Sequence, residues 1–538
     1  MLSIYLILLL LAKEGRSQPI REARCCAHRV RGQLPVHMAS KEAIVPADKP
    51  CVKLKWTRML TMVALFGNTG MFLAGYTTAV QNNAMLPLAE NFNLTTSQKE
   101  GITASTLLFA APTSVLSSTL STAFGRRPVL LMSAGLNVIG GLGCAAAPNY
   151  GVLILGRCIL GIALGLASAT TPMYTGETSP PVHRGRVVGL AEFNVVFGQF
   201  VACMICALTM RFSDVGYWRT PMAISVVFAL LQLFGQYFLP ESPRWLVQQG
   251  RDAEAEQVLL LINSDPKEVP AQLQGIREAV AAEDQASSCT AALTRLYSVP
   301  RLRRAAFVGI MLMTAQQLSG INALMAYSGI LFDDRFPREG AMWLASIAVL
   351  IQLAGVASCF TLIDMLGRRV LLIVSKVLIV VTLLLLSLAF SLEPSASTNV
   401  FLLTSMAAFL IAYGFGLGTI PWIIIAEIFP IDVRAVAVGQ CIVMTWLSNF
   451  VVAALFLDLC EWMGTNGAFA FFAGMSALCV IGFVRYVPET RGMSLEKTVY
   501  LFDDPYPQAT CWPARRQSVE PSRERKTETS KLLSTKPV

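Results

Sequence analysis

Long blocks of apolar residues, separated by short polar stretches, run through most of the chain. Each of twelve such blocks has about 20 residues, enough for a helix to cross the ~30 Å hydrocarbon core of a bilayer. They begin near Met59, Ile102, Val129, Val152, Val187 and Pro221, and again near Ala305, Met342, Val370, Val400, Ala435 and Gly467. The pattern predicts an all-α membrane protein whose twelve transmembrane helices form two sets of six.

One longer polar stretch separates the two sets of helices. Residues 240–304 are charged and helix-prone, as in RDAEAEQVLLL, and are too polar to enter a bilayer. We therefore expect five parts along the chain. They are a largely disordered N-terminal segment (1–57), a first six-helix half (58–239), a helical linker (240–304), a second half (305–487) and a tail (488–538).

The basic residues of the short loops indicate how the chain crosses the membrane, because loops rich in Arg and Lys stay on the cytoplasmic side. The loop arginines on the side of the linker are Arg126, Arg127, Arg184, Arg186, Arg368, Arg369 and Arg434. This places the linker and both termini in the cytoplasm. The opposite loops, including the glycosylation sequon at Asn93, then lie outside the cell. We expect a multi-pass protein of the plasma membrane.

The composition narrows the possible classes of function. Apolar residues make up 54% of the 538 residues and charged residues only 14%, against ~25% in soluble domains. The net charge of +9 reflects basic loops and a basic tail, which indicates topology rather than nucleic-acid binding. The 13 Cys lack metal-ligand spacing, and the sequence offers no nucleotide loop and no nucleophile beside a base. We therefore expect neither an enzyme nor a cofactor.

Three short signatures occur twice, once in each half. Their offsets of 242, 250 and 248 residues are nearly equal, which indicates duplicated halves. The pairs are Gly125-Arg126-Arg127 with Gly367-Arg368-Arg369, Glu177 and Arg184 with Glu427 and Arg434, and Pro240-Glu241-Ser242 with Pro488-Glu489-Thr490. Because arginine can bind carboxylates and helix-end carbonyls at once, they predict a cytoplasmic charge network. The alternative is that these arginines only set the topology.

The stretch TAQQLSGINALMAY, residues 314–327, places several amides at membrane depth. Gln316, Gln317 and Asn322 lie within two helical turns, and Gly320 between them allows the helix to bend. An unpaired amide in hydrocarbon costs roughly 4–8 kcal/mol, so these groups need partners. Such amides suit a neutral polyhydroxylated solute, because each offers donors and an acceptor. The alternative is that they only bind helices to one another.

Taken together, the motifs resemble those of the sugar porters of the major facilitator superfamily, which include facilitative glucose transporters and proton-coupled sugar and inositol symporters. The resemblance covers residues 59–501 and rests on the repeated GRR, PESPRWL, QQLSGINA, PWIIIAEIFP and PETRG. It implies transport of a neutral hexose or polyol by alternating access of two rigid halves, most simply as facilitated diffusion by a monomer. Proton-coupled symport through Glu192 and a sugar sensor on the same fold are the alternatives.

The resemblance also implies the residues of the site and the gates. The substrate-binding residues are Gln316, Gln317, Asn322, Gln352, Trp422, Trp446, Asn449 and Glu192. The residues of the external gate and the charge network are Tyr327, Arg126, Arg127, Arg157, Glu177, Arg184, Glu241, Asp364, Arg368, Arg369, Glu427, Arg434 and Glu489. A further expectation is that helix ten breaks near the glycines of YGFGLGTIP, where it would act as a local gate.

Two departures from the family pattern bear on proton coupling. Thr77 stands where proton symporters carry Asp, which favours facilitated diffusion. Glu192 stands where most relatives have a cavity Gln. A carboxyl group at membrane depth is energetically costly and usually has a function, so Glu192 is a candidate proton site. The alternative is that it stays protonated and acts as a substitute for Gln.

Overall fold

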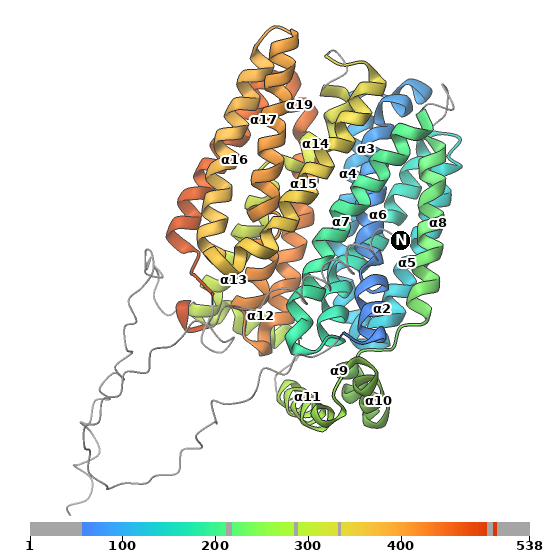
Figure 1. Cartoon of the computed structure of the whole chain (residues 1–538), viewed down its shortest axis with the longest axis vertical. Helices are drawn as coiled ribbons and strands as arrows, with labels where there is room; N and C mark the ends of the chain where they lie inside the picture. Colours follow the sequence, from blue (N-terminus) through green and yellow to red (C-terminus); the bar gives the residue numbers. More distant parts are fainter. Residues whose placement is uncertain (1–55, 211–217, 285–288, 332–334, 492–498, 503–538) are drawn as a thin grey trace, which may run out of the picture. The chain divides into compact units, whose positions relative to one another are not determined.

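α-Helices make up nearly all of the computed structural model of the chain (Figure 1), which describes residues 56–210, 218–284, 289–331, 335–491 and 499–502. The predicted N-terminal segment and most of the predicted tail lie outside these residues. All of the described residues belong to one compact unit. No strand occurs among the described residues.

Six membrane-spanning stretches form the first half. They consist of α2 (Arg58–Phe66) with α3 (Thr69–Phe92), α4 (Thr96–Phe124), α5 (Arg126–Ala145), α6 (Tyr150–Glu177), α7 (Pro181–Met210) and α8 (Arg219–Tyr237). The start of α4 is fixed by a capping box, in which the side chains of Thr95 and Gln98 each bind the other's main-chain N–H.

The second half contains the same number of spans, although several of its helices are interrupted. Its elements are α13 (Pro300–Gln317), α14 (Ile321–Leu331), α15 (Arg338–Leu366), α16 (Arg368–Ser391), α17 (Ala396–Ala412), the π-helix η2 (Tyr413–Leu417), α18 (Ile420–Ile428) and α19 (Ile431–Tyr486). The apolar stretch of α19 has 51 residues, about 76 Å of helix, more than twice the width of a bilayer core. Gly464, with φ +75°, divides it into two spans. The predicted twelve-helix fold is therefore confirmed.

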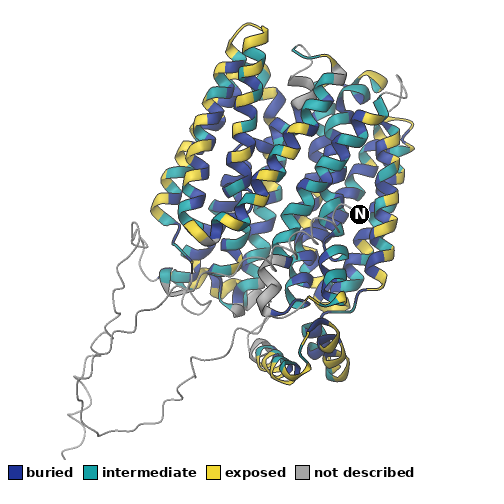
Figure 2. Ribbon diagram, in the orientation of Figure 1, coloured by how far each residue is buried: buried dark blue, intermediate teal, exposed yellow. Residues whose placement is uncertain are grey.

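The linker between the halves folds into short helices. They are α9 (Pro243–Gln248), α10 (Asp252–Ile262), α11 (Val269–Asp284) and α12 (Cys289–Ser298). Leu246, Leu259 and Leu273 are buried in one apolar cluster with Leu60 and Val187, which come from the membrane-spanning helices. The polar faces of α10 and α11 stay exposed (Figure 2). Helices α9 to α11 are thus packed onto the ends of helices of the first half, whereas α12 packs against α13 and α19 of the second half.

The outward faces of the spanning helices are apolar as well. On α16, Val377, Val381, Leu384 and Leu388 are exposed and recur at helical spacing, whereas Leu383 on the same helix is fully buried. An exposed apolar stripe of this kind is stable against lipid rather than water. Three helix pairs, α3 with α14, α4 with α19 and α7 with α15, join the two halves.

Candidate substrate site and gates

The seventh span breaks at the predicted glycine. Helix α13 ends at Gln317 and α14 begins at Ile321, and Gly320 between them has φ +75°, a left-handed conformation that favours glycine. The break places Gln316 and Gln317 at the end of one helix and Asn322 at the start of the next. Asn322 Nδ2 donates to Gln317 Oε1 at 2.6 Å. The amides predicted to bind substrate are therefore brought together at an interruption of the helix.

The tenth span also breaks, in the glycine-rich segment where a gate was expected. Residues 413–417 form one turn of π-helix, which leaves the carbonyl groups of Leu417 and Gly418 available. Gln316 Nε2 donates to both, at 3.1 and 2.8 Å. The side chain of Tyr413 in η2 lies close to that of Gln316. The breaks in the seventh and tenth spans are thus directly linked.

Two residues of α16 support both breaks, and sequence reasoning missed them. Ser375 Oγ donates to Ala412 O at 2.6 Å and accepts from Leu417 N at 2.9 Å. The adjacent Lys376 is fully buried, and its Nζ donates to Ala315 O at 2.9 Å. A lysine within the apolar run VLLIVSKVLIVV was the available signal, because an ionisable group at membrane depth is rarely incidental.

Several predicted binding residues present polar atoms that have no hydrogen-bond partner within the described part of the chain. They are Gln352 Oε1 on α15, and Trp446 Nε1 and Asn449 Oδ1 on α19. A buried polar atom without a partner costs about 1–3 kcal/mol, so such atoms normally serve a ligand or water. The main chain of Gln352 lies against Gly414 of η2. A donor and two acceptors, in the same half as the paired amides Gln317 and Asn322, match the hydroxyl groups of a sugar.

The first half contributes Glu192 to this region. Glu192 lies on α7, is half-buried, and is within electrostatic range of Tyr413 in η2 and Cys359 on α15. Glu192 of the first half therefore lies near helices of the second half. Trp422, on α18, is half-buried and packs against the apolar core of the second half. Its role as the floor of the site stays a prediction.

The repeated signatures form equivalent clusters in the two halves. In the first half, Arg126 binds Glu177 through two hydrogen bonds of 2.9 and 3.0 Å, and Ser242 Oγ also donates to Glu177. In the second half, Arg368 binds Glu427 at 3.4 Å, and Thr490 Oγ1 donates to Glu427 at 2.6 Å. Five pairs of residues thus correspond between the halves: Gly125 and Gly367, Arg126 and Arg368, Glu177 and Glu427, Glu241 and Glu489, and Ser242 and Thr490.

A carboxylate in each cluster caps a membrane helix. Glu241 accepts from the main-chain N–H groups of Arg126 and Arg127 at the start of α5. Glu489 accepts from those of Arg368 and Arg369 at the start of α16, at 3.0 Å each. A negative charge at a helix N-terminus is favourable, because the unpaired N–H groups and the helix dipole point toward it. The sequence motifs PES and PET therefore act as caps.

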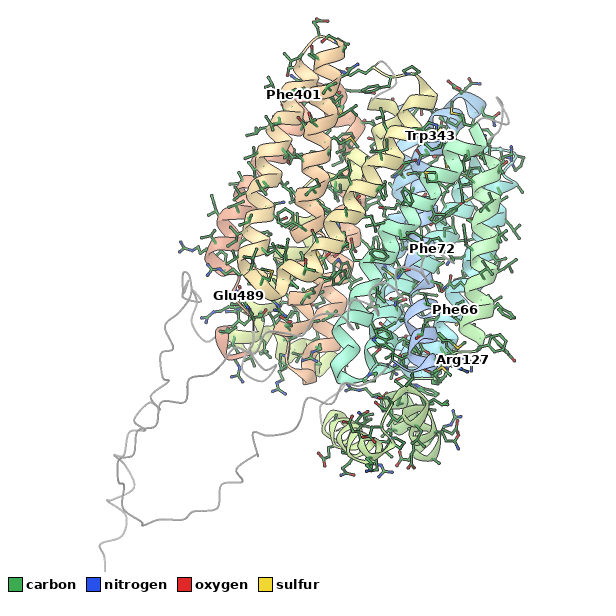
Figure 3. All side chains as sticks on the ribbon, viewed as in Figure 1. Phe66, Phe72, Arg127, Trp343, Phe401 and Glu489 are labelled. Carbon is green, nitrogen blue, oxygen red and sulfur yellow. The ribbon has the colours of Figure 1, made fainter. Side chains whose placement is uncertain are left out.

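Glycine is required where these carboxylates approach the chain. Gly125 has φ +102° and Gly367 has φ +88°. A Cβ at Gly125 would lie 2.4 Å from an oxygen of Glu241, and a Cβ at Gly367 would lie 2.8 Å from an oxygen of Glu489. The side chains of Arg127 and Arg369 each donate to a carbonyl near the end of a helix, that of Tyr237 or Val484. Figure 3 shows Arg127 and Glu489 toward the same end of the spanning helices.

Arg157 does not belong to the cytoplasmic network, so this assignment was wrong. It lies seven residues into α6, about 30 Å of helix from Glu177 at the other end of that helix. Its guanidinium is buried and donates to the Gln81 side chain and to Thr77 O on α3. The spacing of the motif could not reveal this, because Arg157 pairs with an amide and a carbonyl rather than with a carboxylate.

The remaining predicted residues of the gates fall into three groups. Arg434 donates to Phe429 O within its own half, at 3.0 and 2.8 Å, and its place in the charge network stays a prediction. The side chains of Arg184 and Asp364 lie outside the described part of the structure. Tyr327 is fully buried, stacks on Phe456 with ring centroids 5.5 Å apart, and donates from its hydroxyl to Ala453 O at 2.7 Å.

Known proteins resemble the chain over most of its length. A family model described as sugar (and other) transporter matches residues 60–502. The major myo-inositol transporter IolT of Bacillus subtilis is 35% identical, over 83% of this chain and 94% of its own. The human proton myo-inositol cotransporter is 29% identical, over 82% of each chain. The proton:xylose symporter XylE, solved with 6-bromo-6-deoxy-D-glucose, has a TM-score of 0.72 and 26% identity, covering 83% of this chain and 99% of XylE.

Proposed function

Because the chain belongs to the sugar transporter family of the major facilitator superfamily, we propose that it carries a neutral hexose or a polyol such as myo-inositol across the plasma membrane. Transport occurs by alternating access, in which two six-helix halves expose the site first to one side of the membrane and then to the other. The protein acts as a monomer, with both termini in the cytoplasm.

The observation that carries this proposal is the group of amide and indole atoms in the second half. Gln317 and Asn322 meet at the break of the seventh span, and Gln352 Oε1, Asn449 Oδ1 and Trp446 Nε1 are buried without partners in the described structure. A charged substrate would require a counter-charge at these amides, whereas a neutral polyol needs only donors and acceptors. An indole can in addition pack against the C–H face of a sugar ring.

Facilitated diffusion is the simplest mode of transport, because Thr77 offers no carboxyl group beside Arg157. Instead, the Thr77 carbonyl and the Gln81 amide bind the guanidinium of Arg157. Proton symport is the second candidate, and the position of Glu192 on α7, within electrostatic range of Tyr413, favours it. A protonated Glu192 would donate a hydrogen bond to a substrate hydroxyl, as Gln would, and the ionised form would only accept.

Uptake by the purified protein in liposomes tests both points. Glucose, fructose and myo-inositol are supplied with and without an inward proton gradient, to the parent protein and to Glu192→Gln. We expect equilibrative uptake of at least one of them, indifferent to the gradient and retained in Glu192→Gln. Accumulation that follows the gradient and is lost in Glu192→Gln, with equilibrative uptake retained, would establish symport instead. Failure of the folded protein to carry any neutral hexose or polyol would refute the proposal.

A further inference from the structure

Glu100 is a buried carboxyl group that substrate binding does not use. It lies on α4, five residues after the Thr95 cap at the outer end of the helix, and is only 5% exposed. A carboxylate in this position needs hydrogen-bond donors. Its Oε1 accepts from the main-chain N–H groups of Leu457 at 3.0 Å and Asp458 at 3.4 Å. Because α4 belongs to the first half and α19 to the second, these bonds join the two halves.

Tyr327 acts on the same turn of α19. Its hydroxyl donates to Ala453 O at 2.7 Å. In an α-helix, the N–H of residue 457 ordinarily pairs with the carbonyl of residue 453. Tyr327 therefore binds the acceptor, and Glu100 the donor, of one helical hydrogen-bond pair. The same turn of α19 thus receives one side chain from each half of the protein.

The groups around Glu100 oppose a permanent lock. Asp458 and Glu461 on α19 place like charges near it, and Cys460 on α19 and Tyr327 on α14 are within electrostatic range. On the first half, Lys99 precedes it and the Tyr150 hydroxyl lies against Gly101. Thr96 Oγ1 adds a hydrogen bond to Glu461 Oε1 at 3.1 Å. Attraction to two N–H groups is thus set against repulsion by two carboxylates, which suits a contact that forms and breaks in every cycle.

A polar path leads inward from this contact. Thr103 lies one turn after Glu100 on α4, and its Oγ1 accepts from Gln81 Nε2 at 2.8 Å. Gln81 in turn accepts from Arg157, which donates also to Thr77 O. A hydrogen-bonded chain from Thr103 through Gln81 to the buried guanidinium of Arg157 therefore begins one helical turn from Glu100.

We infer that Glu100 is the latch of the outer gate, which closes the extracellular side by binding the main-chain N–H groups of Leu457 and Asp458. Opening to the outside requires these bonds to break. The inference rests on the alternating access proposed above and names the contact that performs its outer closure.

Labelling from outside tests the latch without any substrate. A cysteine is introduced by Leu107→Cys, because Leu107 lies seven residues after Glu100 on the same face of α4 and is 9% exposed. A membrane-impermeant thiol reagent is applied to intact cells, and the signal of the chain without Leu107→Cys is subtracted. Glu100→Ala should raise the labelling rate roughly tenfold, because the outer side then stays open longer.

Three further variants separate the reach of the side chain from its charge. Glu100→Asp keeps the charge but is one methylene shorter, so it should also raise labelling, and it serves if Glu100→Ala fails to reach the surface. Glu100→Gln keeps an acceptor oxygen and should raise labelling less. Glu393→Ala removes an exposed carboxylate of an outer loop and should label at the parent rate. Parent-like labelling of both Glu100→Ala and Glu100→Asp would overturn the latch and leave the transport proposal intact.

Discussion

Gly416, in the π-helix of the tenth span, is a position where one added methyl group should be harmful to both stability and transport. A Cβ built there lies 2.2 Å from Ser375 Cβ and 3.0 Å from Leu371 O. Ordinary contact needs about 3.4 Å, so η2 and α16 would have to separate by roughly 1.2 Å. That shift would displace the Leu417 and Gly418 carbonyls from Gln316. Overpacking of this kind typically costs about 1–3 kcal/mol.

We expect Gly416→Ala to lower both the apparent melting temperature of the purified protein and its rate of sugar uptake. Gly439→Ala is the matched control, because Gly439 lies in α19 of the same half and has nothing within 4 Å of the added Cβ. There the substitution should be neutral, or stabilising by up to about 1 kcal/mol, since alanine favours helix. If Gly416→Ala retains the melting temperature and uptake rate of Gly439→Ala, the close packing of η2 on α16 does not govern transport.

Two more predictions concern buried ionisable groups. Lys376→Met removes a buried charge, so the melting temperature should stay equal or rise. It also removes the hydrogen bond to Ala315 O at the break of the seventh span, so the apparent substrate affinity should weaken by roughly 2- to 13-fold. An unchanged affinity would contradict the supporting role of Lys376. Burial raises the pKa of Glu241 above its ordinary value of 4.5, so its contribution to stability is present below about pH 4.5 and is lost as the pH rises through the raised pKa. The melting temperature measured over a series of pH values should therefore decline less with rising pH in Glu241→Gln than in the parent protein. Identical pH profiles of the two proteins would contradict this assignment to Glu241.

The fold and the broken helices could be predicted because they depend on local sequence. Span lengths follow from the bilayer, and the break at Gly320 and the π-helix around Gly416 lie where glycine removes the constraint on the backbone. The repeated GRR and PES signatures predicted a charge network at helix ends, and the structure adds which members pair, such as Arg126 with Glu177.

The contacts that sequence reasoning missed depend on partners far away in the chain. Glu100 binds the main-chain N–H groups of Leu457 and Asp458, which are 357 and 358 positions away in the sequence. Every residue type except proline has a main-chain N–H, so the sequence does not indicate such a partner. Arg157 was misplaced because a resemblance in residue type does not fix depth in the membrane, whereas its position seven residues into α6 does. Lys376 was overlooked because its partner is also a carbonyl, that of Ala315.

Binding of sugar to the purified protein, measured by calorimetry for the parent and two matched amide variants, tests the central claim most directly. Gln317→Ala removes an amide of the proposed site, whereas Gln232→Ala removes a fully buried amide of α8 that donates to Gln236 on the same helix and accepts from Asn137 of α5, all in the first half. We expect Gln317→Ala to weaken the binding of the transported hexose or polyol by roughly 5- to 150-fold, the equivalent of about 1–3 kcal/mol, and Gln232→Ala to leave it unchanged. Equal affinity of the parent and Gln317→Ala would show that the amides of the seventh span only hold helices together, and would contradict the account.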